Sequence, residues 1–84
     1  MKSQKRLNDF MDVVLGLQNR DQAYDFLVGV LTPAELEILP MRLEIVRRLK
    51  KGVSQTKIAK ELGVGIATVT RGSREIKQKR FKYI

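Results

Sequence analysis

Apolar residues in the first part of the chain recur at three- and four-residue steps, which is the spacing of amphipathic helices. A first helix is predicted over residues 4–18. Its apolar stripe consists of Leu7, Phe10, Met11, Val14 and Leu17. A second helix is predicted to begin at Asp21, whose side chain can accept a hydrogen bond from exposed backbone N–H groups, and to end near Val30 or Leu31. Its apolar face comprises Ala23, Phe26, Leu27 and Val30.

The third predicted helix, residues 33–51, has the clearest start in the sequence. Thr32, Pro33 and Glu35 combine an N-cap hydroxyl, a proline at the first helical position and a glutamate three residues after the cap. Together they form a capping box. The helix should stop at Gly52, which can adopt the left-handed conformation that closes a helix.

Pro40 lies inside this third run, where it lacks a backbone donor and crowds the carbonyl group one turn earlier. We therefore expect a kink or a short break at Pro40. The apolar positions keep a helical spacing across it, and core packing is their expected role. They are Leu36, Leu39, Leu43, Val46 and Leu49.

The segment from Ser54 to Lys79 has the pattern of a helix-turn-helix. Ser54 can cap a helix of about eight residues that Gly63 ends. The motif needs a small residue where the helices cross, a glycine at the turn, and apolar residues after the turn and in the second helix. The residues at these four positions are Ala59, Gly63, Val64 and Val69. The sequence therefore predicts an all-α protein of about five short helices.

A chain of 84 residues is long enough for one domain and too short for two. We divide this domain into core and dimerisation helices over residues 1–52, the helix-turn-helix over 53–79 and a basic tail over 80–84. A domain of this size buries only about 60% of the surface that its unfolded chain exposes. Oligomerisation, most simply as a homodimer, would add stability.

The positive charge is concentrated in the second half of the chain. Residues 43–84 carry twelve Lys or Arg against three acids, a net charge of +9, whereas residues 1–42 carry five against six, a net charge of −1. Such a field attracts polyanions, and phosphate contacts gain affinity by releasing counterions. Charge alone leaves DNA, RNA, an acidic membrane and a solvated basic face as alternatives.

Cysteine and histidine are both absent from the sequence. This absence removes disulfides, thiolate nucleophiles, imidazole bases and the usual zinc ligand sets, so no metal site is expected. The nine acids are scattered, without a pair that suggests carboxylate catalysis. We therefore expect a protein that is not an enzyme. No apolar run approaches the roughly 18 residues of a membrane span, so a soluble cytoplasmic protein is expected.

The outward positions of the second motif helix combine apolar groups suited to a thymine methyl, a hydroxyl, and guanidinium groups for guanine or phosphate. The basic residues beyond Ser73 are expected to contact backbone phosphates. These features indicate binding to double-stranded DNA. The expected DNA contacts are Gln55, Thr56, Lys57, Gly65, Ile66, Ala67, Thr70, Arg71 and Arg74.

These residues resemble the Trp repressor family over residues 31–77. The most specific part of the resemblance is the run Leu62–Ser73, which is similar to the turn and recognition helix of that family. Upstream, the resemblance rests on Leu31-Thr32-Pro33, Glu35, Arg42, Ile45-Val46, Leu49, Gly52 and Ser54-Gln55. It implies an interlocked homodimer whose two reading heads enter successive major grooves of an inverted repeat.

The resemblance also implies a ligand pocket between the third helix and the recognition helix, which in the family binds the corepressor L-tryptophan. No other cofactor is required. An arginine can clamp a carboxylate through two hydrogen bonds, and two arginines can sandwich a flat ring. Alternatively, the two arginines serve surface or phosphate contacts. The ligand-binding residues implied are Leu31 and Thr32, through backbone groups, with Arg42, Arg71, Gly72 and Glu75.

The chain departs from the family pattern at several positions. Glu75 stands where the family has a small hydroxyl residue near the amino group of the ligand, and an acid can pair with an ammonium group. Gly29 replaces a larger apolar wall. Thr56 and Ala59 replace basic residues that face DNA, so we expect a different operator. The family's final helix has no counterpart after the recognition helix, and dimerisation is expected to rest on the first three helices.

The leading hypothesis is a sequence-specific, homodimeric transcriptional repressor, with L-tryptophan or a related amino acid as a possible corepressor. One alternative is a DNA-binding regulator that needs no ligand. Another is a DNA-binding accessory module of a transposase-like machine.

Overall fold

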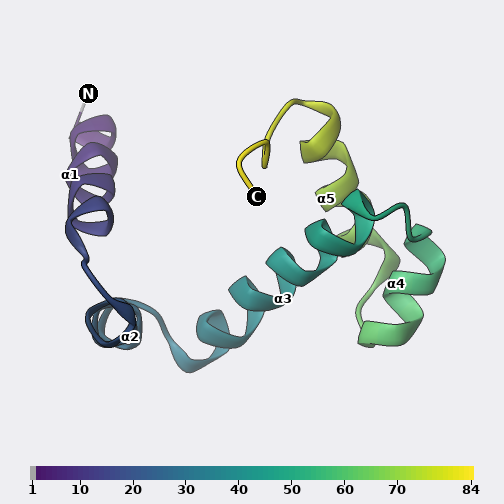
Figure 1. The fold of residues 1–84 in the computed structure, drawn as a ribbon, viewed down its shortest axis with the longest axis horizontal. Helices are drawn as coiled ribbons and strands as arrows, with labels where there is room; N and C mark the ends of the chain where they lie inside the picture. The colour runs from purple at the N-terminus through teal and green to yellow at the C-terminus, as the bar shows by residue number, and fades with distance from the viewer. Residues whose placement is uncertain (1) are drawn as a thin grey trace. The chain divides into compact units, whose positions relative to one another are not determined.

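The computed structural model describes residues 2–84 and contains five α-helices over that range, without a strand. This confirms the predicted all-α class (Figure 1). The chain forms two compact units, one up to Leu36 and one from Glu37 onward. The single domain stays a prediction. The helices are α1 (Lys2–Gly16), α2 (Arg20–Val30), α3 (Pro33–Lys50), α4 (Gln55–Leu62) and α5 (Ile66–Lys77).

The first unit contains α1, α2 and the start of α3. The N-cap of α2 is Asn19 and not, as predicted, Asp21, because the Asn19 side-chain oxygen accepts a hydrogen bond of 2.9 Å from the Gln22 backbone N–H. Asp21 lies in the first turn, where its charge is favourable at the positive end of the helix. The rings of Phe10 and Phe26 lie 5.5 Å apart between centroids. Neither α1 nor α2 contains a buried residue.

The capping box predicted at the start of α3 is confirmed. The Thr32 backbone N–H donates to Glu35 Oε1 at 2.8 Å, and the Glu35 backbone N–H donates to Thr32 Oγ1 at 3.2 Å. The helix continues through Pro40 to Lys50, so the predicted short break does not occur. Proline removes one backbone donor from the helix, and the turns before and after it remain helical.

The core of the second unit lies where α3, α4 and α5 meet (Figure 1). Each of the three helices contributes one buried side chain, and none of these side chains is more than 1% exposed. They are Ile45 of α3, Ile58 of α4 and Val69 of α5. Partly buried apolar residues surround them, including Ala59 and Val64 of the predicted motif. Burying these side chains against one another stabilises the unit through the hydrophobic effect.

The turns around α4 follow from local chemistry. The Ser54 side chain accepts a hydrogen bond from the Lys57 backbone N–H and caps the start of α4. Gly52 and Gly63 have φ angles of +87° and +67°, which glycine adopts without steric cost. Gly63 therefore ends α4 and reverses the chain toward α5, as the helix-turn-helix pattern predicts. Within residues 2–84, every helix is too short or too polar to cross a bilayer.

Candidate DNA-binding surface and ligand cavity

The first turns of α5 present a mixed apolar and basic surface. Ile66 is 50% exposed, and Ala67 and Arg71 are exposed beside it. Gly65 is the N-cap of α5 and has no side chain that could accept a hydrogen bond from the helix. The backbone N–H groups at the start of α5 therefore lack a side-chain cap and can donate to a phosphate. Arg74, one turn further along, is exposed as well.

Thr70 and Gln55 form a hydrogen bond inside the helix-turn-helix. The Thr70 hydroxyl of α5 donates to Gln55 Oε1 at the start of α4, at 2.8 Å, and both residues are half-buried. Both are predicted DNA contacts, and this bond uses part of their polar surface to join the two helices. The Gln55 side-chain NH₂ group can still act as a donor. Thr56 and Lys57, the next two predicted contacts, are exposed in the first turn of α4.

Arg48 links α3 to α4 and has no assigned role in the sequence prediction. Its Nε lies 2.8 Å from Glu44 Oε2, and its Nη1 lies 3.4 Å from Glu61 Oε1. The hydrogen bond from Arg48 lowers the pKa of the Glu44 carboxyl below its usual value. The four-residue spacing of Glu44 and Arg48 was a signal available in the sequence. The contact with Glu61 depends on the fold.

A cavity of about 550 Å³ lies between α3 and α5. It brings together four of the six predicted ligand-binding residues: Arg42 from α3, with Arg71, Gly72 and Glu75 from α5. Ile45 and Val46 form apolar parts of the lining. Two guanidinium groups and one carboxylate beside an apolar floor can bind a small zwitterion with an apolar side chain.

The two remaining predicted ligand residues are not among the cavity lining. Leu31 is the C-cap of α2, and Thr32 is in the capping box of α3. Both belong to the unit that ends at Leu36, whereas the described residues that line the cavity belong to the unit that begins at Glu37. Leu31 and Thr32 therefore stay predicted ligand residues.

Gly72 allows α5 to approach α3 closely. A Cβ atom at this position would lie 3.4 Å from both Ile45 Cγ2 and Leu49 Cδ1. These separations are ordinary van der Waals contacts, so a methyl group fits and a larger side chain does not.

Two further lining residues, Arg80 and Phe81, come from the segment after α5 and were not predicted as ligand contacts. From the sequence, residues 80–84 were predicted only as a basic tail. Lys79 and Phe81 have φ angles of +69° and +60°, a backbone conformation that non-glycine residues rarely adopt. Neither residue type signals such a turn in a sequence, and so the path of this segment was not predictable.

Comparison with known proteins agrees with this geometry. The family model described as Trp repressor protein matches residues 5–83. A Trp operon repressor homolog of Vibrio vulnificus is 43% identical over 83 residues, which cover 94% of this chain and 81% of the relative. A homolog of the same description from Vibrio cholerae is 43% identical over 70 residues, covering 82% of this chain and 68% of the relative.

A third protein of that description, from Vibrio parahaemolyticus, is 50% identical over 60 residues, covering 69% of this chain and 58% of the relative. These matches confirm the family that the residues of the turn and recognition helix indicate. With its five helices and helix-turn-helix, the chain belongs to the Trp repressor family, a family of transcriptional repressors and not of enzymes.

Proposed function

We propose that this protein is a homodimeric, sequence-specific repressor that binds an inverted-repeat operator in double-stranded DNA. We further propose that an amino acid, L-tryptophan or a relative of it, binds the cavity between α3 and α5 as corepressor. The observation that carries the proposal is the position of α5. One helix presents exposed residues suited to a major groove and also forms one wall of a cavity suited to a zwitterion.

DNA recognition depends on the start of α5. Ile66 and Ala67 provide apolar surface for thymine methyl groups, and Arg71 can donate to guanine or phosphate. Gly65 and the uncapped N–H groups that follow it suit a phosphate oxygen. Further contacts along the DNA backbone come from the start of α4, at Gln55, Thr56 and Lys57. Arg74, further along α5, adds another contact of this kind. Thr70 contributes by holding α5 against α4 through Gln55.

Exposed apolar residues support the homodimer. No residue of α1 or α2 is buried, although both helices carry large apolar side chains. A soluble protein rarely leaves so much apolar surface in water, and a second copy of the chain would cover it. The exposed apolar residues on the first three helices include Leu7, Phe10, Met11, Val13, Val14, Leu15, Leu27, Val28, Val30, Ile38, Leu39 and Leu43.

The charges of the cavity suit a free amino acid. Arg42 and Arg71 can bind the carboxylate, and Glu75 can pair with the ammonium group. Gly72 also lines the cavity. By resemblance to the family, backbone groups of Leu31 and Thr32 would complete the site. The proposal needs no metal, no further cofactor and no catalytic step, and it places the protein in the cytoplasm.

The test is a selection of bound sequences from a random DNA pool, carried out with and without L-tryptophan. We expect an inverted repeat with half-sites about one helical turn apart, roughly 34–36 Å. Specific binding should exceed binding to random duplex by about 10³-fold or more at physiological salt. Light scattering on the free protein should report a dimer.

Two variants sharpen this experiment. Arg71→Ala removes a guanidinium group that belongs both to the exposed surface of α5 and to the cavity lining. Lys5→Ala removes one positive charge from α1, outside the motif. We expect Arg71→Ala to lower the affinity for the selected operator and Lys5→Ala to leave it nearly unchanged. Selection of no inverted repeat would contradict the proposed function. If the protein binds one operator with the same affinity with and without L-tryptophan, the corepressor proposal is wrong. That result would favour a regulator that needs no ligand.

A further inference from the structure

The segment after α5, residues 78–84, folds back after the end of that helix (Figure 1). Two of its residues, Arg80 and Phe81, line the cavity. We call it the C-terminal segment. Its first turn is held to α5, because the Arg80 backbone N–H donates to the Glu75 carbonyl at 3.0 Å. Lys50, at the end of α3, holds the remainder of the C-terminal segment. Its Nζ donates to the carbonyl oxygen of Phe81 and, at 2.7 Å, to that of Ile84.

This path is a specific conformation of the C-terminal segment. Lys79 and Phe81 both have left-handed φ angles, which are sterically unfavourable in a residue with a side chain. Such a conformation persists only where surrounding contacts determine it. The hydrogen bonds from Arg80 and Lys50 are contacts of this kind, and they direct Phe81 to the cavity.

Phe81 supplies more exposed apolar surface than the floor of the cavity. Ile45 and Val46 line the cavity but are only 1% and 2% exposed, so their side chains are already covered by the protein core. Phe81 lines the same cavity and is 39% exposed. Among the described residues that line the cavity, Phe81 is the one with an aromatic ring, so a flat ligand ring would gain its aromatic contact there. Arg80 adds a third guanidinium group to those of Arg42 and Arg71.

We propose that Phe81 determines the specificity of this cavity for amino acids with an aromatic side chain, and that Lys50 is the positioning residue that holds it there. This inference rests on the proposed function, since it assigns a role within the same ligand site. The ring of the ligand packs against the ring of Phe81. The carboxylate of the ligand lies among the arginines of the cavity, and the ammonium group of the ligand lies near Glu75. A cavity volume of about 550 Å³ with Phe81 in place lies within the range of small-molecule sites.

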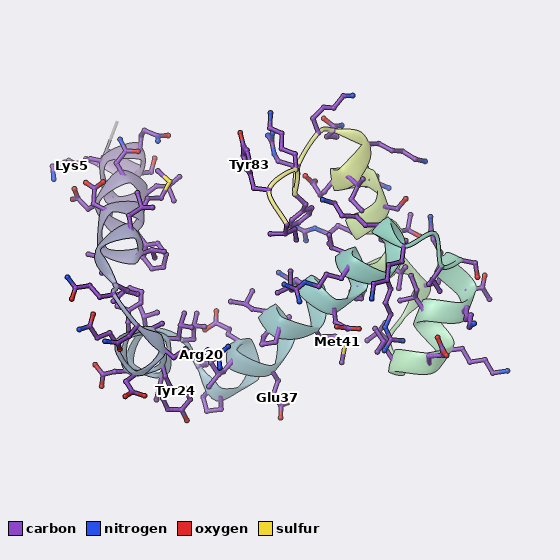
Figure 2. The ribbon with its side chains drawn as sticks, viewed as in Figure 1. Lys5, Arg20, Tyr24, Glu37, Met41 and Tyr83 are labelled. Carbon is purple, nitrogen blue, oxygen red and sulfur yellow. The ribbon has the colours of Figure 1, made fainter. Side chains whose placement is uncertain are left out.

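The neighbouring aromatic residue offers a matched control. Tyr83 belongs to the same segment, but it is 90% exposed and projects outward (Figure 2). Removing its ring changes the same short segment without changing the cavity wall. A comparison of Phe81→Ala with Tyr83→Ala therefore separates the wall contact from a general effect on the segment.

The experiment is calorimetric titration of the purified full chain with L-tryptophan and, separately, with L-leucine, which has no ring. Phe81→Ala should lower the affinity for L-tryptophan about three- to tenfold, the range expected for loss of an aromatic pair. It should change the affinity for L-leucine less, so that the preference between the two ligands falls. Tyr83→Ala should change neither affinity.

Lys50 is tested by rescue. Lys50→Met removes the donor to the Phe81 and Ile84 carbonyl groups and should lower the affinity for L-tryptophan in the same direction as Phe81→Ala. Lys50→Arg retains a donor and should restore much of the affinity. Circular dichroism checks that each variant is folded, and the ratio of the two ligand affinities is insensitive to a loss of folded protein.

The outcomes distinguish this inference from the proposed function. If the unaltered protein binds L-tryptophan and Phe81→Ala binds it equally well, the inference is wrong and the proposed function stands. Tighter binding by Phe81→Ala would also overturn it, because Phe81 would then be a plug that competes with the ligand. If the unaltered protein binds neither amino acid, the proposed corepressor and this inference fail together, while operator selection still tests the repressor.

Discussion

The Thr70 hydroxyl of α5 donates a hydrogen bond of 2.8 Å to the side-chain carbonyl of Gln55 at the start of α4. This bond joins the middle of the proposed recognition helix to the N-terminal end of its neighbour. The buried pair Ile58 and Val69 provides apolar contact between the same two helices. The angle between α4 and α5 therefore depends on a polar contact as well as on core packing, and Thr70 acts first as part of the scaffold.

The first prediction concerns Thr70→Val, which keeps the shape of the side chain but removes the hydroxyl. The variant should lose about 1 kcal/mol of unfolding free energy, because the half-buried Gln55 carbonyl loses its donor. Urea denaturation at fixed protein concentration measures this loss. Thr56→Val is the matched control, since Thr56 is exposed on α4. Equal losses in the two variants would show that the bond contributes nothing to stability.

The second prediction concerns Arg74, which we place against the DNA backbone. Arg74→Ala should weaken binding to specific and random duplex by similar factors, because phosphate contacts carry little sequence information. The slope of log affinity against log salt concentration should become less negative by about two units per dimer, one for each protomer. Fluorescence anisotropy at several salt concentrations measures both quantities. Weakening confined to the specific operator would instead assign Arg74 to base recognition.

Local signals in the sequence were sufficient to predict most of the helix boundaries. The Thr32 and Glu35 capping box, the Ser54 cap and the turn at Gly63 each depend on residues within a few positions of one another. The N-cap of α2 was misassigned because Asn19 and Asp21 are both able to cap, and the choice depends on which backbone N–H each side chain reaches.

The cavity was only partly predictable. Arg42, Arg71, Gly72 and Glu75 follow from the resemblance to a family, and the structure brings them together. The wall formed by Arg80 and Phe81 depends on the hydrogen bonds that Lys50 donates to Phe81 and Ile84. These two partners lie 31 and 34 positions after Lys50 in the chain. Periodicity and capping rules describe neighbours along a helix, so they contain no information on a contact of this kind.

The third prediction concerns Gly72, which packs against α3. Gly72→Ala should stabilise the protein by up to about 1 kcal/mol, because alanine favours a helix and its methyl group would meet Ile45 and Leu49 at ordinary contact distance. Gly72→Val should instead cost about 1–3 kcal/mol, since the added methyl groups overpack the same contact. Urea denaturation measures both changes in unfolding free energy.

Gly29 in α2 provides the control for that series, because a Cβ atom there would meet none of the described residues within 4 Å. Gly29→Ala and Gly29→Val should differ only by the modest difference in helix propensity between alanine and valine. If the Ala-to-Val step costs as little at Gly72 as at Gly29, the close approach of α5 to α3 is not a constraint on residue 72.

The last prediction concerns the pH dependence of the capping box at the start of α3. Hydrogen bonds from the backbone and then the side chain of Thr32 lower the pKa of Glu35 below the unfolded value of 4.5. A carboxyl group whose pKa is lower in the folded state adds stability above pH 4.5, and this contribution disappears as the pH falls through the folded pKa. The stability advantage over Glu35→Gln should therefore shrink as the pH falls below 4.5.

Urea denaturation between about pH 3 and pH 6, a range that spans ordinary carboxyl pKa values, measures this difference. Glu37→Gln on the same helix corrects for the loss of one charge. A constant difference between the unaltered protein and Glu35→Gln across this range would mean that the ionised carboxylate does not stabilise the helix start.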